Sequence, residues 1–114
     1  MARPSDRAVV VAVAGRLDQE SCDRFRLALA PHLSAALGAS QGMVLDLSAL
    51  DYVSSAGLRC FVLAAKEARA QGGRIVAAGL QPMVAEIFRI ARFELVLPVY
   101  ASVDAGIAAL GTGG

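Results

Sequence analysis

The stretch of residues 43–71 constrains the fold most, because its apolar pattern changes period partway along. Residues 43–47 form an almost continuous apolar run with one carboxylate, Asp46, which is typical of a strand covered on both faces. Residues 48–51 are turn formers. Beyond Ser54 the apolar side chains recur at intervals of three and four, which predicts a helix with one apolar face. These side chains are Leu58, Phe61, Val62, Ala65 and Ala68. A buried strand that leads into an amphipathic helix indicates an α/β protein.

Strand and helix patterns alternate along the rest of the chain. Residues 8–14 and 74–78 have the pattern of buried strands, and Pro98 places the last strand, residues 95–100, at a sheet edge. Three further stripes have helical spacing: Cys22, Phe25, Leu29, Leu33 and Leu37; Val84, Ile87, Phe88 and Ala91; and Val103, Ile107 and Leu110. The alternation predicts a single α/β domain, with a mixed, mostly parallel sheet of four to five strands and about four helices.

Polar residues, proline and glycine mark the boundaries of these elements. Residues 15–18 are predicted to form a loop whose Asp18 caps the first helix. Pro31 interrupts that helix at a cost of ~3 kcal/mol, which predicts a kink or two shorter helices. We expect residues 1–6 and 111–114 to be poorly ordered. The other helix boundaries are Gly72 and Gly73 after the second helix, Pro82 at the start of the third and Ser102 before the last.

Composition and charge exclude several classes of function. The net charge of +1 provides no broad basic field for nucleic acid. No apolar run approaches the ~18 residues of a membrane span. Near the N-terminal end, the apolar run before the Ala-x-Ala site at residues 12–14 is shorter than the ~7–15 residues of a signal peptide. Cys22 and Cys60 are too far apart for a CxxC pair, which predicts buried free thiols in a reducing cytosol. We therefore expect a cytoplasmic protein without membrane insertion.

Few residues support catalysis or metal binding. One histidine and two separate cysteines cannot complete a zinc site, and no glycine-rich loop carries a phosphate-binding lysine, so neither a metal nor a cofactor is expected. A small hydrolase that uses His32 as its base stays open as a disfavoured interpretation. Asp18, Asp46 and Asp51 are interpreted as caps and turn residues in preference to paired catalytic carboxylates. The chain is therefore not expected to be an enzyme.

The start of the second predicted helix is where we expect a functional site. The hydroxyl of Ser54 or Ser55 can cap this helix. Ala56 and Gly57 leave the first turn unshielded, so its free N–H groups and the helix dipole tolerate an anion. A phosphate ester on a serine there adds roughly −1.5 to −2 charge at neutral pH and disturbs the fold little. From these residues alone, a simple capping role for both serines remains open.

Several segments resemble one known family. Asp46-Leu-Ser48 and residues 50–58, LDYVSSAGL, resemble the signature of STAS domains, specifically of the bacterial anti-sigma factor antagonists. Residues 15–18, GRLD, are similar to the family's Gly-Glu-Leu-Asp loop, and residues 71–76, QGGRIV, also match. The resemblance spans nearly the whole chain. It implies a single STAS domain over residues 1–114, with an additional short first strand that only residues 1–6 can supply.

The resemblance implies a switch controlled by phosphorylation. Matching Gly57 to the family's glycine places Ser55 at the phosphorylated position, with Ser54 as the second choice. The unmodified protein would bind an anti-sigma factor that is also a serine kinase, the kinase would phosphorylate Ser55, and a PP2C-type phosphatase would reverse the modification. The partner-binding residues implied are Asp18, Tyr52, Val53, Ser54, Ser55, Ala56, Gly57, Leu58 and Arg59.

Two positions depart from the family pattern. Ser54 stands where the family usually has aspartate, and Ala56 stands where it has a second serine or threonine. Ser54 therefore removes a carboxylate beside the phosphoacceptor and offers a kinase a second hydroxyl. A STAS adaptor or sensor that lacks the switch, within a signalling or transporter assembly, stays as the alternative function.

Overall fold

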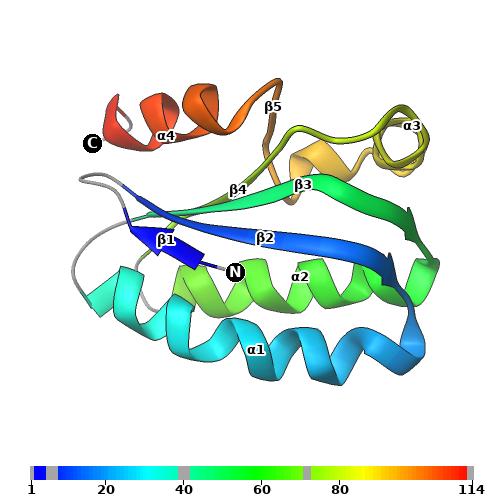
Figure 1. The fold of residues 1–114 in the computed structure, drawn as a ribbon, viewed down its shortest axis with the longest axis horizontal. Coiled ribbons are helices and arrows are strands. Elements are labelled where there is room, and N and C mark those ends of the chain that lie inside the picture. The colour runs from blue at the N-terminus through cyan, green and yellow to red at the C-terminus, as the bar shows by residue number, and fades with distance from the viewer. Residues whose placement is uncertain (1, 5–7, 39–41, 71–72, 113–114) are drawn as a thin grey trace.

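A five-stranded sheet forms the middle layer of the part of the chain that the structure describes (Figure 1). The computed structural model describes residues 2–4, 8–38, 42–70 and 73–112. The strand order is β1-β2-β3-β4-β5, with β1 antiparallel to β2 and each later pair of neighbours parallel. The elements are β1 (Ala2–Pro4), β2 (Ala8–Leu17), α1 (Gln19–Gly38), β3 (Gly42–Val53), α2 (Ser55–Ala70), β4 (Ile75–Ala78), α3 (Pro82–Ile90), a short 3-10 helix η1 (Phe93–Leu95), β5 (Val99–Tyr100) and α4 (Val103–Thr112). The prediction of an α/β fold with a mixed, mostly parallel sheet and about four helices is confirmed.

Helices cover both faces of the sheet, which explains why β3 is apolar along most of its length. Helices α1 and α2 lie side by side against one face, and α4 lies against the other (Figure 1). In β3, Met43 and Leu45 join the large core cluster, whereas Val44 joins a smaller cluster that packs against α4. A central parallel strand buried in this way has no polar face.

The strands β2 and β3 are longer than the sequence pattern predicts. The predicted loop at residues 15–18 and the predicted turn at residues 48–51 are wrong, because β2 continues to Leu17 and β3 to Val53. The Asp46 Oδ1 atom accepts hydrogen bonds from the backbone N–H of Ser48, at 3.1 Å, and from its hydroxyl, at 2.8 Å. The pairing of β2 with β3 shifts register close to these residues, so the turn chemistry produces a bulge and not a chain reversal.

Helix α1 runs through Pro31 as one continuous helix. Of the two predicted alternatives, two shorter helices is therefore wrong, and a kink at Pro31 stays a prediction. Pro31 is exposed, and Leu27, whose carbonyl loses its helical N–H donor, is 76% exposed. Water can therefore hydrogen bond to that carbonyl, which lowers the cost of the proline.

The remaining elements follow the sequence pattern closely. Pro82 begins α3, and the Ser102 Oγ atom accepts the N–H of Ala105 at 3.1 Å to cap α4. The last strand is at the sheet edge as predicted, but it is shortened to β5 by the preceding η1. The strand that only residues 1–6 can supply is β1, with Pro4 at its end. The prediction for Gly72 lies outside the described residues, and so do residues 1, 5, 6, 113 and 114 of the predicted poorly ordered ends. The other residues of these ends belong to β1 and to the end of α4.

Candidate partner-binding site

The candidate site lies at the carboxyl ends of the two central parallel strands, β2 and β3. Leu17 and Val53 are paired at the end of this ladder. The backbone N–H of Ser54 then donates to the Leu17 carbonyl oxygen at 3.0 Å, just before α2 begins. This hydrogen bond fixes the start of α2 against the end of β2.

The two serines at this helix start have different environments. The Ser54 Oγ atom accepts the backbone N–H of Gly57 at 3.1 Å, so Ser54 is the helix cap. Ser54 is half-buried, whereas Ser55 is exposed as the first residue of α2. Among the described residues, no hydrogen bond is made by the Ser55 side chain. The hydroxyl of Ser55 is therefore accessible, and the fold uses only the hydroxyl of Ser54.

Gly57 allows the first turn of α2 to approach the sheet closely. A Cβ atom at this position would overlap with the Leu17 carbonyl oxygen and would lie 2.8 Å from Val53 Cγ2. The backbone oxygen cannot move aside as a flexible side chain would. Only glycine therefore permits this packing of the helix start.

Asp18 and Ser21 cap the neighbouring helix, α1, reciprocally. The Asp18 Oδ1 atom accepts the backbone N–H of Ser21 at 3.1 Å, and the Ser21 Oγ atom accepts the backbone N–H of Asp18 at 2.9 Å. The hydrogen bonds from the Ser21 backbone and hydroxyl hold the pKa of Asp18 below its usual value, and the Arg16 charge adds a smaller effect. The predicted capping role of Asp18 is confirmed.

Arg16 contacts both the carboxylate of Asp18 and the aromatic ring of Tyr52. Its guanidinium carbon lies 4.6 Å from the Tyr52 ring centroid, and its Nε lies 3.8 Å from Asp18 Oδ2. Such a contact between a cation and a ring is favourable and orders both side chains. Sequence reasoning listed Asp18 and Tyr52 but missed Arg16, since its contact with Tyr52 depends on the register between β2 and β3.

Asp46 and Asp51, the other two acidic residues considered for catalysis, have structural partners. Asp46 binds Ser48 as described, and the Asp51 Oδ1 atom accepts a hydrogen bond from the Gln81 side-chain amide at 3.3 Å. The same amide donates to the Ser48 carbonyl oxygen at 2.9 Å. These contacts favour structural roles, in the β3 bulge for Asp46 and beside Gln81 for Asp51, over a pair of catalytic carboxylates.

The predicted partner-binding residues do not all reach the surface. Tyr52, Ala56 and Leu58 are half-buried, and Arg59 is exposed. Val53 is 2% exposed and Gly57 is buried, so these two residues support the helix start from below. The accessible part of the predicted set is therefore Asp18, Tyr52, Ser54, Ser55, Ala56, Leu58 and Arg59.

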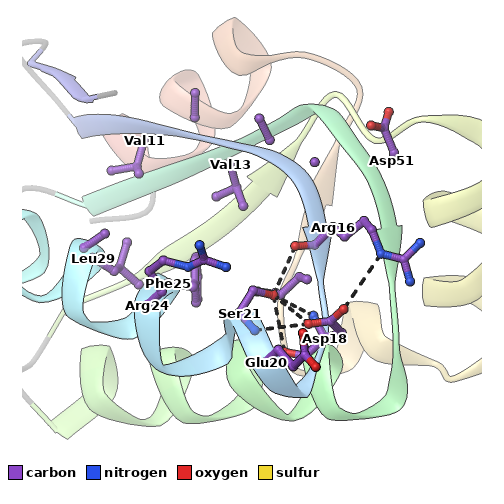
Figure 2. A pocket seen from close by; sticks show the side chains of 15 residues that line it. Val11, Val13, Arg16, Asp18, Glu20, Ser21, Arg24, Phe25, Leu29 and Asp51 are labelled. Atoms are coloured by element: carbon purple, nitrogen blue, oxygen red, sulfur yellow. Dashed lines mark hydrogen bonds and ion pairs between the residues drawn. The ribbon is translucent and has the colours of Figure 1, made fainter.

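An open groove of about 870 Å³ adjoins this edge, between β2 and α1 (Figure 2). Val13 and Phe25 contribute apolar surface, and Arg24 points from α1 toward the strand. Asp18 lies at one end of the groove, so the groove continues the surface of the candidate site.

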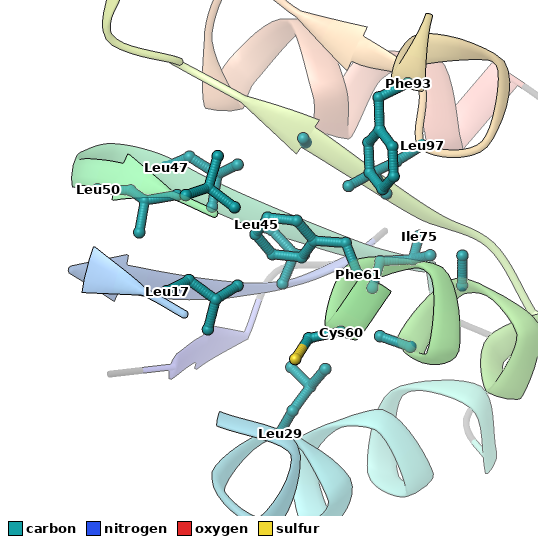
Figure 3. Close-up of a cluster of buried hydrophobic side chains, with 14 of the residues drawn as sticks. Leu17, Leu29, Leu45, Leu47, Leu50, Cys60, Phe61, Ile75, Phe93 and Leu97 are labelled. Atoms are coloured by element: carbon teal, nitrogen blue, oxygen red, sulfur yellow. The ribbon is translucent and has the colours of Figure 1, made fainter. Parts of the chain in front are cut away.

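The core beneath α2 holds the helix rigidly in place. Phe61 projects from α2 into the large cluster between Leu45 and Phe93, and its ring makes an edge contact with Phe25 of α1 at 5.5 Å between centroids (Figure 3). A second link is covalent: Cys22 of α1 and Cys60 of α2 form a disulfide with a Cα–Cα distance of 5.9 Å.

The prediction of two free thiols is therefore wrong. The two cysteines lie on apolar helical faces as expected, but those faces meet when α1 and α2 pack side by side. A separation of 38 residues gives no indication of that contact. The distance between the Cα atoms is within the ordinary range for a disulfide.

Other kinds of site receive no support from the described residues. Within them, no group of three or more His, Cys, Asp or Glu side chains is placed to hold a metal ion. The side chain of His32 lies outside the described set, so the structure provides no support for a hydrolase that uses His32 as its base. None of the described helices is long and apolar enough to cross a membrane.

Comparison with known proteins identifies the class to which this fold and site belong. The family model described as Mlab, STAS domain, matches residues 1–98. The protein BtrV of Bordetella bronchiseptica, which is assigned to the anti-sigma factor antagonists, is 35% identical over 107 residues, or 94% of this chain and 90% of BtrV. The chain therefore belongs to the STAS domain family and, within it, to the anti-sigma factor antagonists.

Two solved structures show the same fold. TM1081 of Thermotoga maritima, also assigned to the anti-sigma factor antagonists, has a TM-score of 0.84 at 16% identity, with 97% of this chain and 93% of that chain covered. The anti-sigma factor antagonist SpoIIAA, in its unphosphorylated form, has a TM-score of 0.65 at 18% identity, with 100% and 98% covered. At these identities the likeness concerns the fold alone.

Proposed function

We propose that this anti-sigma factor antagonist binds an anti-sigma factor serine kinase while Ser55 is unmodified, and that phosphorylation of Ser55 releases it. A PP2C-type phosphatase would remove the phosphate and reset the cycle in the cytoplasm. In this way the protein would take part in signal transduction and transcription regulation by partner switching. The observation that carries the proposal is the exposed hydroxyl of Ser55, which makes no hydrogen bond among the described residues. The neighbouring Ser54 is the residue that caps the helix.

The chemical step is a phosphoryl transfer from ATP held by the kinase. The Ser55 oxygen attacks the γ-phosphorus, a new O–P bond forms, the bond to the β-phosphate oxygen breaks, and ADP leaves. The hydroxyl proton passes to a base on the kinase. Ser55 provides only the nucleophile, so no catalytic group is required of this chain.

A phosphate at this position would act on binding and not on folding. A dianion buried in an interface without a cation from the partner costs several kcal/mol, against the ~8 kcal/mol of a micromolar complex. The folded chain loses no interaction, because the Ser55 hydroxyl makes none within the described residues. Negative charge at a helix start is moreover favourable by about 0.3–1 kcal/mol.

Matched alanine variants of the two serines test the proposal. The chain is incubated with a cognate anti-sigma factor kinase and ATP, and phosphate is located by mass spectrometry. We expect one phosphate on the parent chain and on Ser54→Ala, and none on Ser55→Ala. We expect Ser54→Ala alone to lose stability, by ~1 kcal/mol, because it removes the helix cap.

Binding measurements complete the test. Ser55→Asp should weaken kinase binding by about 3 kcal/mol, or ~100-fold in Kd, with a nearly unchanged melting temperature. Phosphate on Ser54, or no phosphate with any partner kinase, would contradict the proposal. The second outcome would instead support the adaptor or sensor function in a signalling or transporter assembly.

A further inference from the structure

The spacing of Ser55 and Arg59 places both side chains on one stripe of α2. Ser55 is the first residue of this helix, and Arg59 follows four residues later. Side chains at this spacing are neighbours on a helix, with Cβ atoms ~5–6 Å apart. Both residues are exposed, whereas Gly57, Cys60 and Phe61 belong to the buried face. Ser55 and Arg59 therefore face solvent together.

Arg59 has no anionic partner among the described residues. The first turn of α2 contains no acidic residue, and none of the ion pairs found there involves Arg59. The first carboxylate along the helix, Glu67, is eight residues further on, or ~12 Å at the rise of an α-helix.

Several of the other charged side chains at this end of the sheet already have partners. Arg16 contacts the Tyr52 ring and Asp18, and Asp18 is further bound by Ser21. Asp51 accepts its hydrogen bond from Gln81. Arg59 is the cation closest to Ser55 along α2, and it has no ion-pair partner among the described residues.

We propose that Arg59 is the intramolecular counter-ion of a phosphate on Ser55, so that phosphorylation withdraws this cation from the partner-facing surface. This inference rests on the proposed function, because it concerns the same serine. The planar guanidinium donates two parallel hydrogen bonds to phosphate oxygens. The exposed stripe thus changes from one positive charge to a net charge of about −0.5 to −1. A partner that binds the unmodified surface therefore loses its contact with Arg59 and must also bury the added phosphate.

A phosphorus NMR titration of the full chain tests this pairing directly. Phosphoserine is installed at position 55 during translation, so no kinase is needed, and the second pKa of the phosphate is measured. A nearby cation favours the dianion and lowers this pKa. We therefore expect Arg59→Gln to raise the phosphate pKa by ~0.3–0.5 units. Arg59→Lys should retain most of the lowering, and Arg69→Gln, in the last turn of α2, should leave the pKa unchanged.

The outcomes separate this inference from the proposed function. Identical titrations of the parent and Arg59→Gln would overturn the pairing, and so would a shift produced by Arg16→Gln in place of Arg59→Gln. Thermal melting of each phosphorylated variant establishes that it is folded. If no kinase modifies Ser55 but Arg59→Gln still raises the phosphate pKa, the proposed function fails and the pairing stands. If a kinase modifies Ser55 but Arg59→Gln leaves the phosphate pKa unchanged, the proposed function stands and the pairing fails.

Discussion

Substitution of Gly57 by alanine should destabilise the chain strongly, although alanine is the better helix former. The new Cβ would overlap with the Leu17 carbonyl oxygen, which also accepts the N–H of Ser54. Overpacking against a backbone atom costs up to ~3 kcal/mol, and weakening of that hydrogen bond adds ~1 kcal/mol. The higher helix propensity of alanine returns ~1 kcal/mol. We expect a net loss of about 3 kcal/mol.

Gly106 in α4 provides a matched control. It is also a buried glycine inside a helix, but its added Cβ would lie 3.4 Å from the Val44 methyl groups and 3.5 Å from Val76 Cγ2. These are ordinary contact distances, so Gly106→Ala should gain ~0.5–1 kcal/mol from helix propensity. The two substitutions add the same methyl group and should have opposite effects.

Urea denaturation and thermal melting followed by circular dichroism measure the difference. At ~4–5 °C per kcal/mol for a domain of this size, Gly57→Ala should melt ~12–15 °C below the parent and Gly106→Ala a few degrees above it. Equal shifts for the two variants, or a Gly57→Ala protein as stable as the parent, would refute the argument that the approach of α2 to Leu17 requires glycine.

Two further predictions concern α1. Reduction of the disulfide, or replacement of Cys22 and Cys60 by alanine, should lower the free energy of unfolding by about 4 kcal/mol, the loop-closure value for a separation of 38 residues. Thermal melts with and without reductant measure this loss of stability. The double variant is the control, since its melting temperature should not respond to reductant. Titration of two free thiols in the oxidised protein would contradict the prediction. The pKa of Asp18 is lower in the folded than in the unfolded chain, so its contribution to stability is present above the unfolded pKa and is lost as the pH falls through the folded value. The loss of stability between pH 5 and pH 2 should therefore be smaller in Asp18→Asn, and unchanged acid sensitivity in that variant would contradict the assignment.

The sequence was most informative where one physical pattern dominates. The change of period between residues 43–47 and α2 predicts both elements, because burial on two faces and burial on one helical face produce different repeats. The extension of β2 to Leu17 and of β3 to Val53 was missed, because Asp46 and Ser48 have the same local chemistry in a bulge as in a turn.

Contacts between distant elements could not be predicted at all. The Cys22–Cys60 disulfide and the contact of Arg16 with Tyr52 depend on helix packing and strand register, which no local pattern encodes. The choice between Ser54 and Ser55 as the helix cap was open for a different reason, because a serine hydroxyl at either position can accept an N–H one turn further on. It required the hydrogen bond from the Gly57 N–H, which assigns the capping role to Ser54.

The serine at position 54 caps this helix without adding a negative charge, whereas an aspartate would add one. A neutral hydroxyl caps the first turn through Gly57 and leaves the turn without a carboxylate. An aspartate at position 54 would also cap, but its charge would repel a phosphate on Ser55, since like charges a few ångströms apart oppose each other even near a surface. With Ser54 as the cap, we expect a phosphate on Ser55 to interact with the positive end of the helix dipole and with Arg59, the counter-ion proposed above. The proposed phosphate would therefore destabilise the fold little, and its free-energy cost would arise where a partner must bury it.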